Sequence, residues 1–378
     1  MAGDWFSESF RNEYLKQQTS MGRFNLAIFG KTGVGKSTLV NAIFGEEIAR
    51  TGIGEPVTRG SHLYRAASGN LGVVDTQGLE VGRDDKQLIK ELNEVVKTSR
   101  KQPLSEQIHV AWYCVRGMDR RFEASEAEFI KRLHELDIPV VVVLTQVPVK
   151  DGRYHPDAIE LARQISALGL PIVGGHPYLT NAKADEFAGL PAHGLQELLD
   201  ATFRVAPEAV HGALAAAQQI DAKRKAMEAQ KHVVIAAGAA AAAAASPIPF
   251  SDAAMLVPIQ LGMMARIAQI YKIKFERAAL LAVASTTAAT QIGRATFTGL
   301  LKLIPGVGTA AGGAISAGIA STYTFAMGQA WAVVCQRVAA GKFTKAGDVI
   351  DNRAVNELFM DEFKKRVTIR HKESTPVE

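Results

Sequence analysis

The segment Gly30-Lys31-Thr32-Gly33-Val34-Gly35-Lys36-Ser37 constrains the fold of this chain more than any other feature. It has the pattern G-x-x-x-x-G-K-[ST], follows the apolar stretch FNLAIF and precedes the helical stretch TLVNAIFG. A strand, a glycine-rich loop and a helix in this order form a phosphate-binding loop, because successive backbone N–H groups and the helix N-terminus surround the phosphate oxygens. The Lys36 ammonium is expected at the β- and γ-phosphates, and the Ser37 hydroxyl is expected on Mg²⁺. The residues of this segment predicted to contact a nucleotide are Lys31, Thr32, Gly33, Val34, Gly35, Lys36, Ser37 and Thr38.

Two further segments are typical of a nucleotide-dependent switch. Asp75-Thr76-Gln77-Gly78 ends the apolar stretch LGVVD. There Asp75 could bind Mg²⁺ through water, and the N–H of Gly78 could meet the γ-phosphate. Thr58 lies in the glycine-containing stretch GIGEPVTRG and could close on Mg²⁺ only when a γ-phosphate is present. The predicted metal ligands are therefore Ser37, Thr58 and Asp75.

The first half of the chain has the pattern of an α/β domain. Up to about residue 205, short β-type apolar stretches alternate with helical, charged ones, namely FNLAIFG, LGVVD, IHVAWYCV, IPVVVVLT and LPIVGGHPYLT. Strands separated by helices predict a mostly parallel sheet covered on both faces. The 378 residues allow two or three domains, and a hydrophobic content of 47% excludes a chain that is disordered as a whole.

The second half differs in composition and predicts an all-α domain rich in alanine and glycine. Residues 206–232 are expected to form one charged amphipathic helix, whereas residues 233–336 carry only eight charged side chains. A last amphipathic helix is expected near 352–366 and is followed by a basic tail. The predicted divisions are an N-terminal amphipathic extension, an α/β domain, a helical linker, an apolar all-α domain and a C-terminal helix with its tail, at 1–22, 23–205, 206–232, 233–340 and 341–378.

These segments together resemble known families. GKTGVGKSTLVNAIFG, the PVT at 56–58 and DTQG at 75–78 are similar to the Era-like bacterial GTPases and the related immunity-related GTPases. The resemblance implies a Ras-like G domain that binds GTP and GDP with Mg²⁺ and hydrolyses GTP slowly. The apolar half, including SPIPFSDAAMLVPIQLGMMARIAQIY and LIPGVGTAAGGAISAG, resembles a bacterial domain of unknown function that also occurs in YcjF-type inner-membrane proteins.

The segments expected to read the base depart from the family pattern. The family has [N/T]-K-x-D after a strand, with the lysine packed over the purine and the aspartate accepting two hydrogen bonds from guanine. Here Thr145 is kept, but Gln146 replaces the lysine and Pro148 replaces the aspartate. Asp151 could reach the base only if the loop is rearranged. After the last strand, Asn181 and Ala182 match the second base-contacting loop, where the N–H of Ala182 would face the base. Guanine preference and relaxed base choice both stay open.

The hydrolytic machinery is also incomplete in the sequence. Leu79 occupies the position where Ras-type enzymes place a glutamine that orients the attacking water. Gln77, Gly78 and Lys31 are the candidates for a catalytic role, and none of them is assigned. Besides a slow GTPase, two alternatives remain open: a nucleotide-binding scaffold module with little hydrolysis, and a P-loop ATPase with relaxed base specificity.

The apolar half predicts a location and a set of partners. Residues 233–250 and 303–336 carry no charge, which suggests engagement of a membrane surface or bilayer, whereas a soluble Ala/Gly-packed bundle is the alternative. Two cysteines and an N-terminus without an apolar secretory core favour the cytoplasm or the cytoplasmic side of a membrane. A homodimer through the G domains and an unknown protein partner are possible partners. A net charge of +5 is too weak to indicate nucleic acid.

Overall fold

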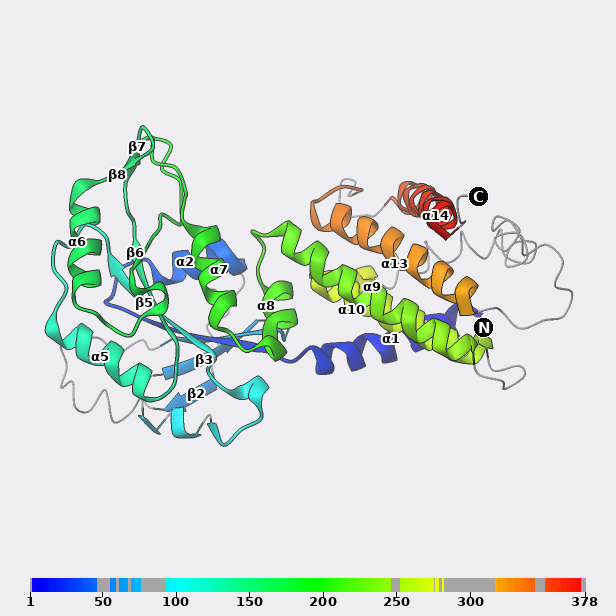
Figure 1. The fold of residues 1–378 in the computed structure, drawn as a ribbon, viewed down its shortest axis with the longest axis horizontal. Coiled ribbons are helices and arrows are strands. Elements are labelled where there is room, and N and C mark those ends of the chain that lie inside the picture. The colour runs from blue at the N-terminus through cyan, green and yellow to red at the C-terminus, as the bar shows by residue number, and fades with distance from the viewer. Residues whose placement is uncertain are drawn as a thin grey trace, which may run out of the picture. The chain divides into compact units, whose positions relative to one another are not determined.

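The structure is a computed structural model of the chain, and it contains two compact units. One unit is residues 21–222, and the other combines residues 1–20 with residues 223–378 (Figure 1). The residues that it describes are 2–45, 55–58, 61–66, 69–75, 93, 94, 96–98, 100–245, 252–274, 276–278, 281, 317–343 and 351–374. We call the first unit the G unit and the second the helical unit.

The G unit is built on a seven-stranded sheet with the order β2-β3-β4-β1-β5-β6-β9. Five strands match the apolar stretches of the sequence and pair in parallel, namely β1 (Phe24–Phe29), β4 (Leu71–Asp75), β5 (Val110–Arg116), β6 (Val140–Thr145) and β9 (Tyr178–Leu179). The predicted parallel sheet is therefore confirmed. An antiparallel edge of β2 (Glu55–Thr58) and β3 (Ser61–Arg65) was not predicted, because both strands are short and lack an apolar pattern.

The core of the G unit lies along three adjacent strands of the sheet, β1, β5 and β6. Every residue of β1 and β6 is buried, and so are Trp112, Tyr113 and Cys114 on β5. Such continuous burial is typical of parallel strands that are covered on both faces. The helices of the unit are α2 (Lys36–Phe44), α5 (Ala124–Glu135), α6 (Pro156–Ala167), α7 (Leu195–Val205) and α8 (His211–Ala217), with 3-10 turns at η1 (Leu104–Glu106), η2 (Val173–Gly175) and η3 (Glu208–Val210).

The prediction of one continuous helix over 206–232 is wrong. Helix α8 ends at Ala217, and the next helix, α9 (Ala222–Ala244), begins after a turn. The buried side chain of Gln218 closes this turn: its Oε1 accepts from the Asp221 N–H at 2.7 Å, and its Nε2 donates to the Asp221 carbonyl at 2.9 Å. Residues 213–217 are buried where α8 packs against β1 and β4. This packing assigns α8 to the G unit, a tertiary effect that an alanine-rich sequence does not reveal.

The helical unit contains α1 (Ala2–Met21), α9, α10 (Asp252–Ile270), α13 (Ala317–Ala339) and α14 (Asn352–Ser374). The N-terminal segment, expected as a separate extension, packs inside this unit. The Tyr14 hydroxyl donates to the Ile273 carbonyl at 2.9 Å, and Arg266 donates to the Gln17 carbonyl at 3.0 Å. The helix expected near 352–366 is present as α14 and extends to Ser374.

Small residues set the helix packing in this unit. Ala240, Ala244 and Ala320 form a buried cluster with Leu256. At Gly328 a Cβ would lie 2.6 Å from the Met263 sulfur and 2.8 Å from the Val233 side chain, so α13 approaches its neighbours closely only because this residue is glycine. Within the described residues, no helix combines the length and apolarity needed to cross a bilayer. Residues 246–250 and 303–316 of the two uncharged segments lie outside the described residues.

Candidate functional site

The glycine-rich loop between β1 and α2 has a backbone that only glycine accommodates. Gly30 has φ +130°, and a Cβ there would lie 2.2 Å from the Cys114 carbonyl oxygen on β5. Gly33 and Gly35 also have positive φ, at +80° and +95°. These angles lie in the region that favours glycine, and they turn the loop around a concave backbone surface. The loop predicted from the sequence is therefore present where the strand meets the helix.

Lys36 crosses the mouth of this loop. Its Nζ donates to the carbonyl oxygens of Gly30, at 2.7 Å, and Lys31, at 3.0 Å. No side chain caps the N-terminus of α2 at Gly35, which leaves its first N–H groups for an anion. Ser37 and Thr38 are exposed on the first turn of α2. The ammonium, the free N–H groups and the hydroxyls together form a site suited to a polyphosphate.

Lys31, a candidate for catalysis, forms an ion pair with the neighbouring loop. Its Nζ lies 2.8 Å from Glu123 Oε1, and both side chains are partly exposed. The pKa of the Lys31 ammonium is raised by this hydrogen bond, and the pKa of the Glu123 carboxyl is lowered by the same contact. Glu123 also forms a capping box with Glu126 at the start of α5. The Lys31 charge is therefore partnered by the Glu123 carboxylate.

The segments predicted as switches end at the edge of the sheet where β1 leads into the glycine-rich loop. Ile28, which precedes Gly30 by two residues, pairs with Asp75 in the parallel register of β1 and β4. On the antiparallel edge, Thr58 pairs with Ser61, and His62 pairs with Asp75. The backbone thus places Asp75 beside the strand that leads into the glycine-rich loop. Gln77, Gly78 and Leu79 lie outside the described residues.

A cavity of about 700 Å³ adjoins the glycine-rich loop. It is lined by residues from α2, from the ends of β5 and β6, and from the loop after β9. Six of the residues that the sequence predicted for nucleotide contact meet here: Gly35, Thr38, Thr145, Gln146, Asn181 and Ala182. The cavity is therefore the expected place for the base and sugar of a nucleotide; we call it the base cavity.

The segment that departs from the family pattern contacts the glycine-rich loop. The Thr145 hydroxyl donates to the Val34 carbonyl at 2.5 Å, and its oxygen lies 3.2 Å from the Val115 carbonyl. Gln146 has φ +54°, and its Nε2 donates to the Gly33 carbonyl at 3.1 Å. Gln146 thus lies against the loop as a neutral side chain, although the family pattern has a lysine at this position.

Asp151 does not line the base cavity. It lies exposed in the turn between β7 (Val149–Lys150) and β8 (Arg153–Tyr154), a two-stranded hairpin apart from the main sheet. Pro148 lines the cavity but has no side-chain acceptor. The rearranged loop that would bring Asp151 to a base is absent from the described structure.

Four further polar residues line the base cavity, namely Arg116, Lys183, Asp185 and Glu186, and no sequence pattern predicts Asp185 or Glu186 there. Arg116 ends β5 at the edge of the sheet where ligands bind, and Lys183 directly follows the predicted residues Asn181 and Ala182. The acidic pair follows Ala182 by three and four residues, where no fixed motif exists. The only available signal was the short sequence ADEF after the last strand.

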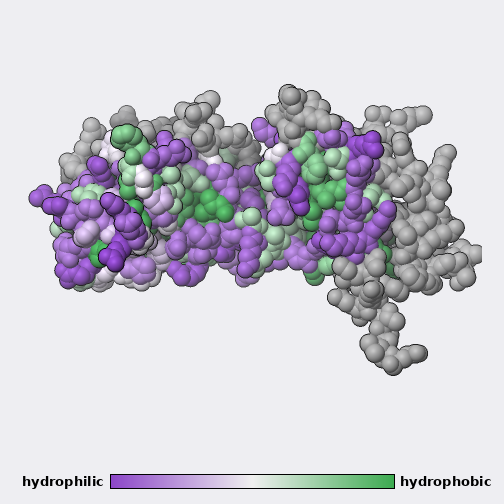
Figure 2. Space-filling view, turned by 90° about the horizontal axis from the view of Figure 1, so that it is seen from above, coloured by the Kyte–Doolittle hydropathy of each residue, from purple (hydrophilic) through white to green (hydrophobic). Residues whose placement is uncertain are grey.

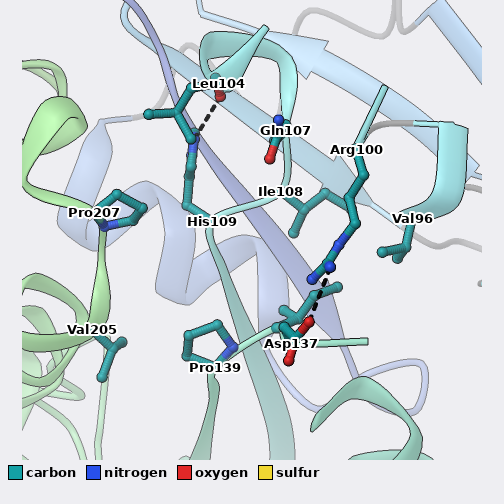
Figure 3. A pocket seen from close by; sticks show the side chains of 11 residues that line it. Val96, Arg100, Leu104, Gln107, Ile108, His109, Asp137, Pro139, Val205 and Pro207 are labelled. Carbon is teal, nitrogen blue, oxygen red and sulfur yellow. Dashed lines mark hydrogen bonds and ion pairs between the residues drawn. The ribbon is translucent and has the colours of Figure 1, made fainter. Parts of the chain in front are cut away.

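A second, smaller cavity of about 280 Å³ lies where the chain enters β5 and β6 (Figure 3). His109 on its wall is buried, which lowers its pKa, and its Nδ1 accepts from the Asn25 N–H at 2.9 Å. Its Nε2 lies 2.8 Å from the Leu104 carbonyl, so one neutral tautomer satisfies both contacts. Arg100 and Asp137 pair at 3.0 Å across the cavity. These groups are partnered within the fold, and no metal-binding group of His, Cys, Asp or Glu occurs among the described residues.

The sheet, the glycine-rich loop and the base cavity define residues 21–222 as a P-loop GTPase fold. Residues 25–146 match the family described as "50S ribosome-binding GTPase". Residues 211–356 match a domain of unknown function, and α8 at the start of this match packs in the G unit. The resemblance of the first half to Era-like GTPases and of the second half to a domain of unknown function is thereby confirmed.

Individual relatives match the same part of the chain. "GTPase Der" of Nitrobacter winogradskyi is 33% identical over 190 residues, which is 49% of this chain and 36% of that protein. "GTPase Era" of Carboxydothermus hydrogenoformans is 26% identical over 187 residues, 48% of this chain and 55% of that protein. The chain thus spans between a third and slightly over half of the length of these relatives.

Among solved structures, a probable GTP-binding protein engB is 21% identical with a TM-score of 0.34, covering 48% of this chain and 97% of that one. Era of Aquifex aeolicus, crystallised with GDP and AlF4⁻, is 19% identical with a TM-score of 0.32, covering 57% of this chain and 68% of that one.

Proposed function

We propose that this chain is a GTPase that binds GTP and GDP with Mg²⁺ and hydrolyses GTP slowly to GDP and phosphate. The observation that carries the proposal is the geometry of the glycine-rich loop. Lys36 spans the loop mouth, the glycines hold its concave backbone, and the N-terminus of α2 has no side-chain cap. The match of residues 25–146 to a GTPase family supports guanosine as the nucleoside.

Mg²⁺ would be held by the Ser37 hydroxyl and reached by Asp75 through water. Hydroxyl, carboxylate and water oxygens are the ligands that Mg²⁺ prefers beside phosphates. Thr58 would join them when the γ-phosphate is present and would order the segment around it. The bound ion would draw negative charge from the β- and γ-oxygens while the chain's own N–H groups hold the phosphates in place.

Slow hydrolysis is expected from two side chains, Leu79 by its place in the sequence pattern and Lys31 by its contact in the structure. Leu79 cannot orient a water molecule, and Lys31 is paired with Glu123 at 2.8 Å. A lysine whose charge is neutralised by a neighbour offers little stabilisation to charge that develops on the phosphate. A partner or a second copy that supplies the missing group would raise the rate.

Phosphate release from GTP over many turnovers tests this proposal. The wild-type chain is expected to turn over GTP slowly and ATP not at all above background. A Lys36→Ala variant is expected to lose the activity, whereas Lys101→Ala, which removes an exposed lysine outside the site, keeps it. Equal rates for the wild type and Lys36→Ala, or equal rates with ATP and GTP, would contradict the proposal.

A nucleotide-binding scaffold is the second candidate. The absence of a carboxylate at Pro148 and of a glutamine at Leu79 favours it. In that case GDP and GTP analogues would bind tightly, and the phosphate released would not exceed one equivalent per chain. The same assay therefore separates the two functions.

We further propose that the helical unit carries the switch to a membrane surface on the cytoplasmic side. The resemblance to YcjF-type membrane proteins motivates this, and an exposed face of α9 supports it. Met227, Val234 and Ile235, at helical spacing on one face, are 58%, 54% and 65% exposed, and the exposed Lys223 and Lys231 lie on the same helix. Figure 2 also shows an apolar area on the helical unit between hydrophilic side chains. Apolar residues beside cations are typical of helices that lie in the headgroup region of anionic membranes.

Flotation with anionic liposomes tests the membrane proposal. The chain loaded with a non-hydrolysable GTP analogue is expected to float, and the chain loaded with GDP is expected to float less. A Val234→Asp/Ile235→Asp variant should stay at the bottom in both states. Ile159→Asp on α6 is the matched control, because Ile159 is 50% exposed and lies in the G unit. Equal flotation of the α9 variant and the wild type would contradict the proposal.

The alternative partner is a second copy of the chain, bound through the G units. Such a homodimer would be detected as a nucleotide-dependent change of mass in the absence of lipid.

A further inference from the structure

The polar groups of the base cavity are mostly engaged with the protein itself. Gln146 Nε2 donates to the Gly33 carbonyl, and Thr145 donates to the Val34 carbonyl. Asn181 Nδ2 donates to the Pro191 carbonyl at 2.8 Å. These three side chains shape the cavity, and each has one donor group in use inside the fold. The amide of Gln146 or Asn181 offers a base one neutral acceptor oxygen, whereas a carboxylate offers two charged oxygens.

The loop after β9 is held in a defined position beside the cavity. Asn181 and His193 exchange backbone hydrogen bonds of 3.1 and 2.9 Å, and so do Asp185 and Leu190, at 2.8 and 2.9 Å. The His193 ring nitrogen Nε2 lies 2.9 Å from the Val147 carbonyl, which ties this loop to the loop after β6. Backbone hydrogen bonds therefore hold this loop, which carries the acidic residues Asp185 and Glu186, in one conformation.

Two carboxylates of this loop line the base cavity, and they differ in their surroundings. Asp185 Oδ1 accepts from the Ala188 N–H at 3.0 Å and so closes the turn. Glu186 is exposed, and among the described residues its carboxylate accepts no hydrogen bond and forms no ion pair. Glu186 thus offers two acceptor oxygens at the edge of the site.

A carboxylate distinguishes guanine from adenine, because the two purines present different groups to it. Guanine presents two adjacent donors, N1–H and the N2 amino group, which a carboxylate accepts in a fork. Adenine presents its N6 amino group beside the N1 lone pair, and this lone pair repels a second carboxylate oxygen. A carboxylate facing that edge therefore favours guanine.

We propose that Glu186 reads the guanine edge, in place of the carboxylate that Pro148 cannot supply. This inference rests on the proposed function, since it assigns the base reader of that same nucleotide site. Glu186 comes from the loop after β9, whereas the family pattern places the reader after β6. Asp151, the first acidic residue after Pro148, lies exposed in its own hairpin and outside the cavity.

Nucleotide titrations of the full chain test this assignment. Glu186→Gln changes one acceptor oxygen into a donor and keeps the size of the side chain. Guanine would then lose one hydrogen bond to a charged acceptor, so GDP affinity should fall by about 10- to 100-fold. Xanthine carries N1–H beside a carbonyl oxygen, which an amide complements, so the affinity for xanthosine diphosphate should rise. A residue that only stabilised the loop would not reverse the preference in this way.

Asp151→Asn is the matched control, because it makes the same change of charge on the displaced loop. It should leave the ratio of GDP to xanthosine diphosphate affinity unchanged. If Glu186→Gln retains the wild-type preference for GDP, the assignment of Glu186 is overturned while GTP binding stands. If Asp151→Asn switches the preference, the reader is Asp151, and the assignment is overturned as well. If the wild-type chain binds neither GDP nor GTP, the proposed function falls and this inference falls with it.

Discussion

The two ends of the nucleotide site are built in different ways. At the phosphate end, the structure follows the sequence pattern residue by residue, from Gly30 with its φ of +130° to Lys36 across the loop mouth. At the base end, Gln146 and Pro148 replace two side chains of the family pattern. The cavity there is lined instead by Arg116 at the end of β5 and by Lys183, Asp185 and Glu186 from the loop after β9. Both ends of the site lie along the edge of the sheet that is formed by the carboxyl ends of β1, β5 and β6.

Phosphate binding and base reading constrain the sequence to different degrees. Phosphate binding depends on backbone N–H groups in one unusual conformation, which requires glycine at fixed positions. Base reading depends on one acceptor placed at the edge of the purine, and any loop that reaches this edge can provide it. The phosphate end is therefore visible in the sequence, whereas the base end is visible only after folding.

The largest effect is expected at Gly30. Gly30→Ala would place a Cβ 2.2 Å from the Cys114 carbonyl at a φ of +130°, so the free energy of unfolding should fall by about 3–5 kcal/mol. Chemical denaturation of the nucleotide-free chain measures this. Gly33→Ala is the control: its φ is +80°, but no atom lies within 4 Å of the added Cβ, so the cost should be near 1 kcal/mol. Equal losses at the two positions would contradict the geometry of the phosphate end.

The next effect concerns Lys36. Lys36→Ala removes the ammonium that lies 2.7 Å from the Gly30 carbonyl, and GDP affinity should fall about 100-fold because charged contacts to phosphate are strong. Titration with a fluorescent GDP derivative checks the loss, and an unchanged melting temperature without nucleotide shows that the fold is kept. Wild-type affinity in this variant would mean that the phosphates bind elsewhere.

Mg²⁺ dependence should be next in size. In the wild-type chain, chelating Mg²⁺ should weaken a GTP analogue, and Ser37→Ala should weaken it about tenfold in the presence of Mg²⁺, because one metal ligand is lost. The variant should then respond less to the chelator than the wild type does. An identical chelator response in both chains would remove Ser37 from the metal site.

A smaller effect is expected at Gln146, on the boundary between the two ends. Gln146→Ala loses the 3.1 Å hydrogen bond to the Gly33 carbonyl, a neutral contact at an exposed side chain, so GDP affinity should fall about fivefold. Gln146→Lys can restore a donor to this carbonyl and should bind GDP at least as well as the wild type. Stronger loss in the lysine variant than in the alanine variant would show that the glutamine has another role.

The smallest effect is expected for the ion pair between Lys31 and Glu123. Both side chains are more than a third exposed, and solvent screening keeps such pairs weak. Lys31→Ala and Glu123→Gln should each change GDP affinity by less than about twofold. A hydrolysis rate that falls in Lys31→Ala but not in Glu123→Gln would make Lys31 a catalytic residue.

The sequence predicts those parts of the fold that depend on local patterns. The five parallel strands are apolar and bounded by turns, and all of them form. The hairpin of β2 and β3 is not predictable in this way, because its strands have only four and five residues and lack an apolar pattern. The break at Gln218 is hidden for another reason: an alanine-rich stretch favours helix throughout, and the buried side chain that ends α8 acts through tertiary packing.

The candidate site likewise contains residues that local sequence patterns predict and residues whose positions depend on the folded structure. The phosphate end is predicted by Gly30 and the seven residues that follow it. Thr145, Asn181 and Ala182 line the cavity, as their positions at or after the ends of strands predict. Glu186 could not be assigned, because its role depends on how the loop from Asn181 to His193 closes. The side chains of Thr58 and Asp75 keep their roles as predictions.

Calorimetric titration of the purified full chain with GDP and with ADP, in the presence of Mg²⁺, measures phosphate binding and base choice together. We expect one GDP bound per chain, with ADP bound at least tenfold more weakly and with GDP binding lost in Lys36→Ala. Equal affinity for GDP and ADP would contradict the guanine-reading base end. No binding of either nucleotide would contradict the phosphate end as well.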